Sequence, residues 1–159
     1  KNLMTEVDAS ERRRAAEEEA TKTIVNAIEQ RLSKINDELR QGTGQRLTLM
    51  TSGNRVWRVE SRQHDAGLVL KIDGEAGGRV TVSISARKRE PQTLLDVGAD
   101  ECVGDSGDTN YKVLEGFDNR VKRAIGFCLT TYWLKGNRAL EYSPDDVVAA
   151  VPDIDDLVQ

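Results

Sequence analysis

The sequence predicts an α+β fold with a long N-terminal helix, an antiparallel sheet of five or six strands, and a C-terminal helix packed on one face of the sheet. Three observations support this prediction. Residues 8–41 contain neither Pro nor Gly, residues 45–93 hold strand-like segments separated by short turns, and residues 121–132 carry apolar side chains at helical spacing. With 159 residues and 38% hydrophobic side chains, the chain is long enough for one core but short for two.

The N-terminal helix is expected over about residues 8–41, with a capping box formed by Thr5 and Asp8 or by Asp8 and Glu11. Its second half has an apolar face at helical spacing, formed by Ile24, Ile28, Leu32, Ile35 and Leu39. Its first half reads ERRRAAEEEA and has only alanines for such a face. We therefore expect residues 1–20 to form a projecting or frayed helical extension, residues 21–142 a single α+β domain, and residues 143–159 a short acidic helix and tail.

The middle of the chain has the alternation of antiparallel strands. RLTLMT and RVWRVESR flank a predicted turn at residues 52–54, where Gly53 permits a positive φ. GLVLKID and GRVTVSISAR follow, and in the second of these Val80, Val82 and Ile84 alternate with polar residues. TLLDVGADECV and NYKVLEG predict two further strand-like pieces.

The segment from residue 121 to residue 135 allows two interpretations. Val121, Ala124, Ile125 and Cys128 share one face of a helix, with Asp118 as a candidate N-cap. IGFCLTTYWL, however, is rich in β-forming residues and has a glycine near its start, which favours a strand. We expect the helix and keep the strand as the alternative.

The net charge of −4 conceals a segregation along the chain. Residues 45–93 carry nine Lys and Arg against five Asp and Glu, whereas residues 94–115 carry one against six. The basic strands predict either a solvated face or a surface for an acidic ligand. The candidate anion-binding residues are Arg55, Arg58, Arg79, Arg87, Lys88 and Arg89. Since Trp57 is the only aromatic residue here to stack on bases, nucleic acid is not an expected partner.

Residues 100–107, DECVGDSG, resemble the segment around the nucleophilic serine of chymotrypsin-like serine proteases. The resemblance implies Ser106 as a nucleophile and agrees with the chain order of that family, in which a histidine such as His64 comes first. The match stops at Asp108, where the family has glycine and where a carboxylate would oppose the developing oxyanion. We therefore expect an acidic loop, and keep a hydrolase that uses Ser106 as an alternative.

No metal or cofactor site is predicted. The carboxylates of residues 100–108 lack the alternating spacing of a calcium loop, and Cys102, Cys128 and one histidine make no zinc-ligand set. Two thiols are typical of an intracellular protein, and a secreted protein with one disulfide is the alternative. No apolar run reaches the roughly 18 residues of a membrane span. Because the sequence starts at Lys1, a targeting segment could precede it.

Together these observations predict a non-enzymatic protein-binding or assembly module, such as an adaptor. Its size and acidic composition are similar to those of small secretion chaperones and toxin-immunity proteins. The N-terminal helix is expected to self-associate as a coiled coil or to bind a partner helix. The candidate partner-binding residues are Arg13, Arg14, Glu17, Glu18, Ile24 and Ile28. A binder of phosphate-bearing or nucleic-acid ligands through the basic strands is the alternative class, beside the hydrolase.

Overall fold

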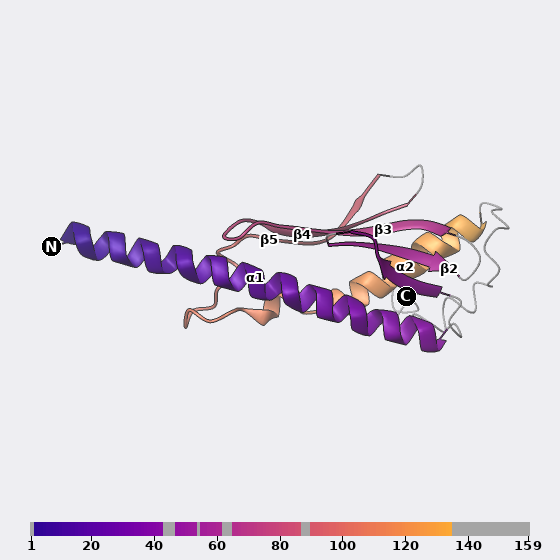
Figure 1. The fold of residues 1–159 in the computed structure, drawn as a ribbon, viewed down its shortest axis with the longest axis horizontal. Helices are drawn as coiled ribbons and strands as arrows, with labels where there is room; N and C mark the ends of the chain where they lie inside the picture. The colour runs from indigo at the N-terminus through magenta and orange to yellow at the C-terminus, as the bar shows by residue number, and fades with distance from the viewer. Residues whose placement is uncertain (1, 43–46, 54, 62–64, 87–89, 135–159) are drawn as a thin grey trace.

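The computed structural model describes residues 2–42, 47–53, 55–61, 65–86 and 90–134 (Figure 1). Their elements, in chain order, are α1 (Asn2–Gly42), β1 (Leu47–Thr51), β2 (Val56–Ser61), β3 (Asp65–Gly74), β4 (Val80–Ser85), β5 (Gln92–Val97), the 3-10 helix η1 (Tyr111–Leu114) and α2 (Phe117–Leu134). The predicted α+β class is confirmed, with a helix at each end of a single antiparallel sheet.

The sheet is a simple meander. Each strand pairs antiparallel with its neighbours in the chain, so the spatial order is β1-β2-β3-β4-β5. The predicted turn between β1 and β2 is confirmed, since the Ser52 N–H donates to the Val56 carbonyl at 2.7 Å and Gly53 has a φ of +98°. The predicted alternation in β4 is confirmed as well, because its side chains are alternately buried and half-buried from Val80 onward.

Both helices cover one face of the sheet. Helix α1 contacts β1 and β3, α2 contacts β3 and β5, and the two helices contact each other (Figure 1). The apolar face of α1 and one face of the strands meet in a single core, whose most completely buried large side chains include Ile24, Ile28, Leu32, Leu68, Leu70, Ile84 and Phe117. On the other face of β4, Thr81, Ser83 and Ser85 are half-buried. The fold therefore has one layer of helices and one of strands.

Two expectations about the chain after β5 have a clear outcome. The segment from residue 121 lies in a helix, since α2 runs unbroken from Phe117 to Leu134. The prediction of a strand-like piece at NYKVLEG is wrong, because this segment contains the 3-10 helix η1. The Asn110 side chain accepts a hydrogen bond from the Lys112 N–H at 3.2 Å and turns the backbone into a helical curve, while Leu114 is buried.

The beginning of α1 also differs from expectation. The helix starts at Asn2, ahead of Asp8, so the predicted capping boxes do not mark its beginning. Residues 143–159, expected to form an acidic helix and tail, lie outside the described residues. Among the helices that are described, none has the length and apolarity needed to cross a membrane.

Candidate functional site

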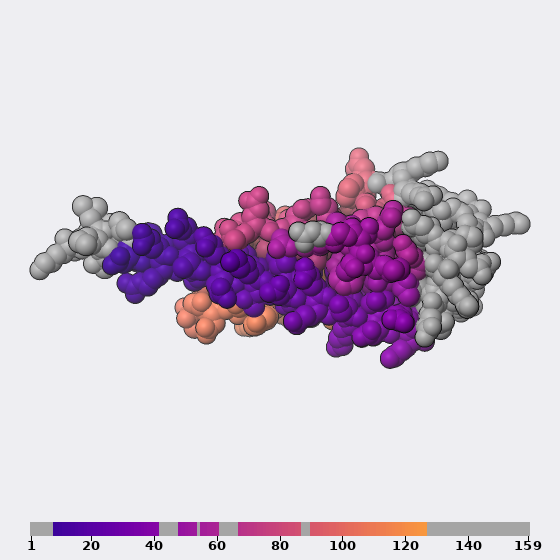
Figure 2. Space-filling view, viewed as in Figure 1, coloured from indigo at the N-terminus to yellow at the C-terminus, as the bar shows by residue number. Residues whose placement is uncertain are grey.

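The first candidate surface is the part of α1 that extends past the sheet. Residues 8–15, here called the projecting segment, are exposed on every side, and Figures 1 and 2 show α1 continuing well beyond the end of the strands. The segment is helical because it continues a helix whose second half is held by the core, so that no separate nucleation is needed. An ion pair one turn apart, from Arg13 Nε to Glu17 Oε1 at 3.3 Å, adds to this.

The point at which α1 leaves the body is defined by contacts with the turn between β3 and β4. The Gly77 N–H donates to Thr21 Oγ1 at 3.0 Å, and this hydroxyl in turn donates to the Glu18 carbonyl at 3.0 Å. Thr21 is 1% exposed, and Ala20 is buried in the core. The apolar side chains of α1 are therefore packed against the body from the partly buried Ala16 onward and include buried ones from Ala20.

The six predicted partner-binding residues separate into two groups. Arg13 and Arg14 are exposed, and Glu17 and Glu18 are half-buried where the helix meets the body. Ile24 and Ile28 are both 0% exposed, because they fill the core beneath the sheet and leave no surface for a partner. The surface that α1 can offer is thus made of its charged and uncharged polar residues and alanines.

The basic residues predicted to bind an anion are partly used within the fold. Arg55 Nη1 donates to the Gly74 carbonyl at 2.7 Å, and the Arg79 guanidinium is paired with the Asp96 carboxylate. Arg58 is exposed on β2, where it lies opposite Val69 of β3. Residues 87–89 lie outside the described part of the chain. Arg55 and Arg79 therefore already have partners within the fold, and an anion-binding surface formed by the basic residues stays a prediction.

The DECVGDSG segment forms a short hairpin that follows β5. Val103 and Thr109 form an antiparallel bridge, and the Gly104 N–H donates to the Asp108 carbonyl at 2.7 Å. At the tip, the exposed Ser106 Oγ donates to Asp108 Oδ2 at 3.2 Å. His64 is outside the described residues. Among the residues that are described, no group of three or more His, Cys, Asp and Glu could hold a metal ion.

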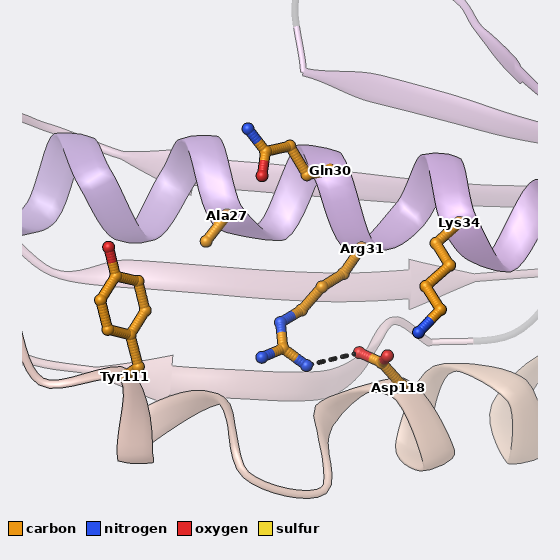
Figure 3. Close-up of a pocket in the computed structure, with 6 residues that line it drawn as sticks. All are labelled: Ala27, Gln30, Arg31, Lys34, Tyr111 and Asp118. Carbon is orange, nitrogen blue, oxygen red and sulfur yellow. Dashed lines mark hydrogen bonds and ion pairs between the residues drawn. The ribbon is translucent and has the colours of Figure 1, made fainter.

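A polar groove lies between α1 and the η1–α2 segment. Its volume is about 390 Å³, and its lining residues are Ala27, Gln30, Arg31, Lys34, Tyr111 and Asp118 (Figure 3). Arg31 Nη1 pairs with Asp118 Oδ1 at 3.1 Å across the groove, and the Tyr111 hydroxyl points toward α1. The Lys34 ammonium points across from α1 toward α2 (Figure 3).

This groove was not predictable from the sequence. Arg31 and Lys34 are three residues apart on α1, which is the spacing of neighbours on a helix surface, but the same spacing is found on most solvated helix faces. Tyr111 and Asp118 are about 80 residues away in sequence, and only the packing of α2 beside α1 brings them close. No local pattern of residues could have joined the two sets.

Comparison with known proteins does not assign the site. No protein-family model, no curated protein and no solved structure matches this chain.

Proposed function

We propose that this protein is a non-enzymatic protein-binding module that presents the projecting segment of α1 to a partner. One observation carries the proposal: residues 8–15 are a helix that is exposed on all sides and is continuous with a helix held in the core. Such a segment contributes little to the packing of its own domain. A preformed helix also loses less conformational entropy on binding than a segment that must fold on its partner.

The proposal is tested by removing residues 1–12, which include most of the projecting segment, while keeping the core. A chain that begins at Arg13 keeps Ala16, Ala20 and Thr21, where the contacts with the body begin. Proteins captured from the native host by the full chain are identified by mass spectrometry, purified, and titrated against both chains by calorimetry. We expect binding to the full chain and a loss of at least about tenfold in affinity for the shortened chain. Equal affinity of the two chains would contradict the proposal.

The groove beside α1 supports a second candidate function, the binding of an anionic group. Its cationic side chains, Arg31 and Lys34, outnumber the single carboxylate of Asp118, and the Tyr111 hydroxyl adds a donor. Arg31 uses one terminal nitrogen for Asp118, so its remaining N–H groups are available to a ligand oxygen. A carboxylate or phosphate group fits this excess of donors.

The second candidate is tested with inorganic phosphate as the probe. NMR titration is expected to shift the amide signals of Lys34 and Tyr111, and Lys34→Gln is expected to weaken binding several-fold because a cation is lost. Lys22→Gln is the matched control, since Lys22 is an exposed lysine of α1 outside the groove. An equal effect of the two substitutions would show that phosphate responds only to the overall charge of α1.

A further inference from the structure

The charged residues where α1 meets the body are arranged with positive charges before a central pair of alanines and negative charges after it. Residues 12–19 read RRRAAEEE, with three arginines and three glutamates on either side of Ala15 and Ala16. If two such helices are placed antiparallel about a two-fold axis between these alanines, each arginine block faces the glutamate block of the other copy. A parallel pair in register would place arginine against arginine and glutamate against glutamate.

The exposed side of α1 presents these charges in a line. Asp8, Arg12, Ala15, Glu19 and Lys22 are all exposed and follow one another at intervals of four and three residues. That spacing keeps them on one side of the helix. The line runs on from the projecting segment over the packed part of the helix, on the side turned away from the core residues Ile24 and Ile28.

The ion pairs between the two copies join charged residues that are too far apart to pair within one copy. Arg12 and Glu19 are seven residues apart, about 10 Å along the helix axis, and cannot form a pair within one copy. In the antiparallel arrangement Arg12 of each copy lies opposite Glu19 of the other, and Asp8 lies near Lys22. Within the described residues, the only ion pair inside RRRAAEEE is that of Arg13 with Glu17.

The centre of the line favours close approach. Ala15 is exposed and has no side chain beyond Cβ, so two helix backbones can come together at this point. A two-fold interface uses the same surface on both copies, and here that surface is complementary to itself in charge.

From this order and exposure we infer that the partner of the projecting segment is a second copy of this chain, bound antiparallel with its two-fold axis between Ala15 and Ala16. The inference rests on the proposed function, because it names the partner of the same helix. It is carried by charge complementarity, and the association therefore weakens as the salt concentration rises.

Sedimentation equilibrium of the full chain in 50 mM and 500 mM NaCl tests the inference. We expect a dimer whose dissociation constant rises by about tenfold or more between the two conditions. The variants R12E/K22E and D8K/E19K, whose positions all belong to the exposed line, are each expected to be monomeric, because each places like charges opposite one another. An equimolar mixture of the two is expected to form the dimer again. Circular dichroism and thermal unfolding verify that both variants remain folded.

Matched control variants separate this pairing from attraction between oppositely charged molecules. K71E/K112E and D37K/D105K make the same changes of net charge at exposed positions outside the line. Each is expected to dimerise as the wild type does. A wild-type chain that stays monomeric overturns the inference. It does not contradict the proposed function, which is tested separately by the shortened chain. A dimer that survives both R12E/K22E and D8K/E19K also overturns the inference.

Spin labels measure the direction of the pair independently of the charge variants. Labels on A15C, in a C128S background, are expected to lie close together across the axis. Labels on D8C should be separated by at least about 22 Å along the helices, because fifteen residues at 1.5 Å lie between the two positions. Short distances at both positions would indicate a parallel pair and overturn the inferred direction.

Discussion

Cys102 lies at the base of the acidic hairpin and is 0% exposed. Burial raises the pKa of its thiol, and the neighbouring carboxylates of Glu101 and Asp100 raise the pKa further because they disfavour a second negative charge. The thiol is therefore protonated at neutral pH. A protonated, buried thiol is a poor nucleophile and a poor metal ligand, so Cys102 is a packing residue.

We predict that Cys102 reacts with a thiol reagent only when the protein opens. In a C128S background, the reaction with Ellman's reagent at pH 8 is expected to be slower in the native protein than in urea by about a hundredfold or more. The physical reason is that both burial and the raised pKa remove accessible thiolate. Complete reaction of the native protein at the rate of a free thiol would contradict this prediction.

The same thiol contributes to the dependence of stability on pH. Because the pKa of Cys102 is raised in the folded state, the unfolded chain loses its proton first as pH rises above about 8.5, the ordinary value for a thiol. The contribution to the free energy of unfolding is present below that pH and decreases above it. Urea unfolding at pH 8 and pH 10 is expected to show a smaller decrease in C102A than in wild type. Identical decreases would contradict the prediction.

At the scale of elements, α1 protects the outer edge of the sheet. Asn36 Oδ1 accepts a hydrogen bond from the Leu49 N–H at 2.8 Å, and β1 pairs with β2 on its other side. An unpaired strand edge can pair with the edge of another molecule, and covering it with a helix is one way to prevent this. The helix therefore has both a packing role and an edge-covering role in its second half.

We predict that Asn36→Ala lowers the free energy of unfolding by about 1–3 kcal/mol, because the partly buried Leu49 N–H loses its acceptor. Asp37→Ala is the matched control, since Asp37 is the exposed neighbour, and it should change stability by no more than about 0.5 kcal/mol. Urea unfolding followed by circular dichroism measures both. Equal effects would show that the hydrogen bond has no particular importance.

The elements differ in how well the sequence predicted them. β4 was predictable because burial of one face imposes a period of two on its own residues, as Val80 and Val82 show. The strand expected at NYKVLEG failed because its alternation is short, and the bond from the Lys112 N–H to Asn110 instead begins a helical turn. A short segment with mixed polarity has too few positions to distinguish the period of two of a strand from the period of about 3.6 of a helix.

For the whole molecule, the two helices form one layer through ion pairs as well as through the core. Arg31 pairs with Asp118, and Lys122 pairs with Glu38. These pairs are partly exposed, and each is expected to contribute less than about 1 kcal/mol. The shared core, which includes Phe117 and Ile28, therefore provides most of the stability of this layer.

We predict that the stability of the molecule is independent of residues 1–12, which include most of the projecting segment. A chain that begins at Arg13 is expected to have the same urea midpoint as the full chain at low protein concentration, because it loses no buried side chain among the described residues. Ile28→Ala, in contrast, is expected to cost about 2–5 kcal/mol, since it leaves a cavity in the core. A large loss on truncation would show that the projecting segment contacts the body.

The sequence was sufficient to identify what depends on a segment's own residues: the helical period of α1, the alternating strands, the turn at Gly53, and a charged N-terminal stretch with no apolar face. The helix, the strands and the charged stretch follow from which side chains of one segment are buried and which face water, and the turn follows from the positive φ that Gly53 permits. The folded chain was needed for whatever depends on distances between segments. The groove that joins Lys34 to Tyr111 and the burial of Cys102 arise because α2 and the hairpin pack against elements far away in sequence. The Asn36–Leu49 bond arises because α1 packs against β1, and no local period encodes either packing.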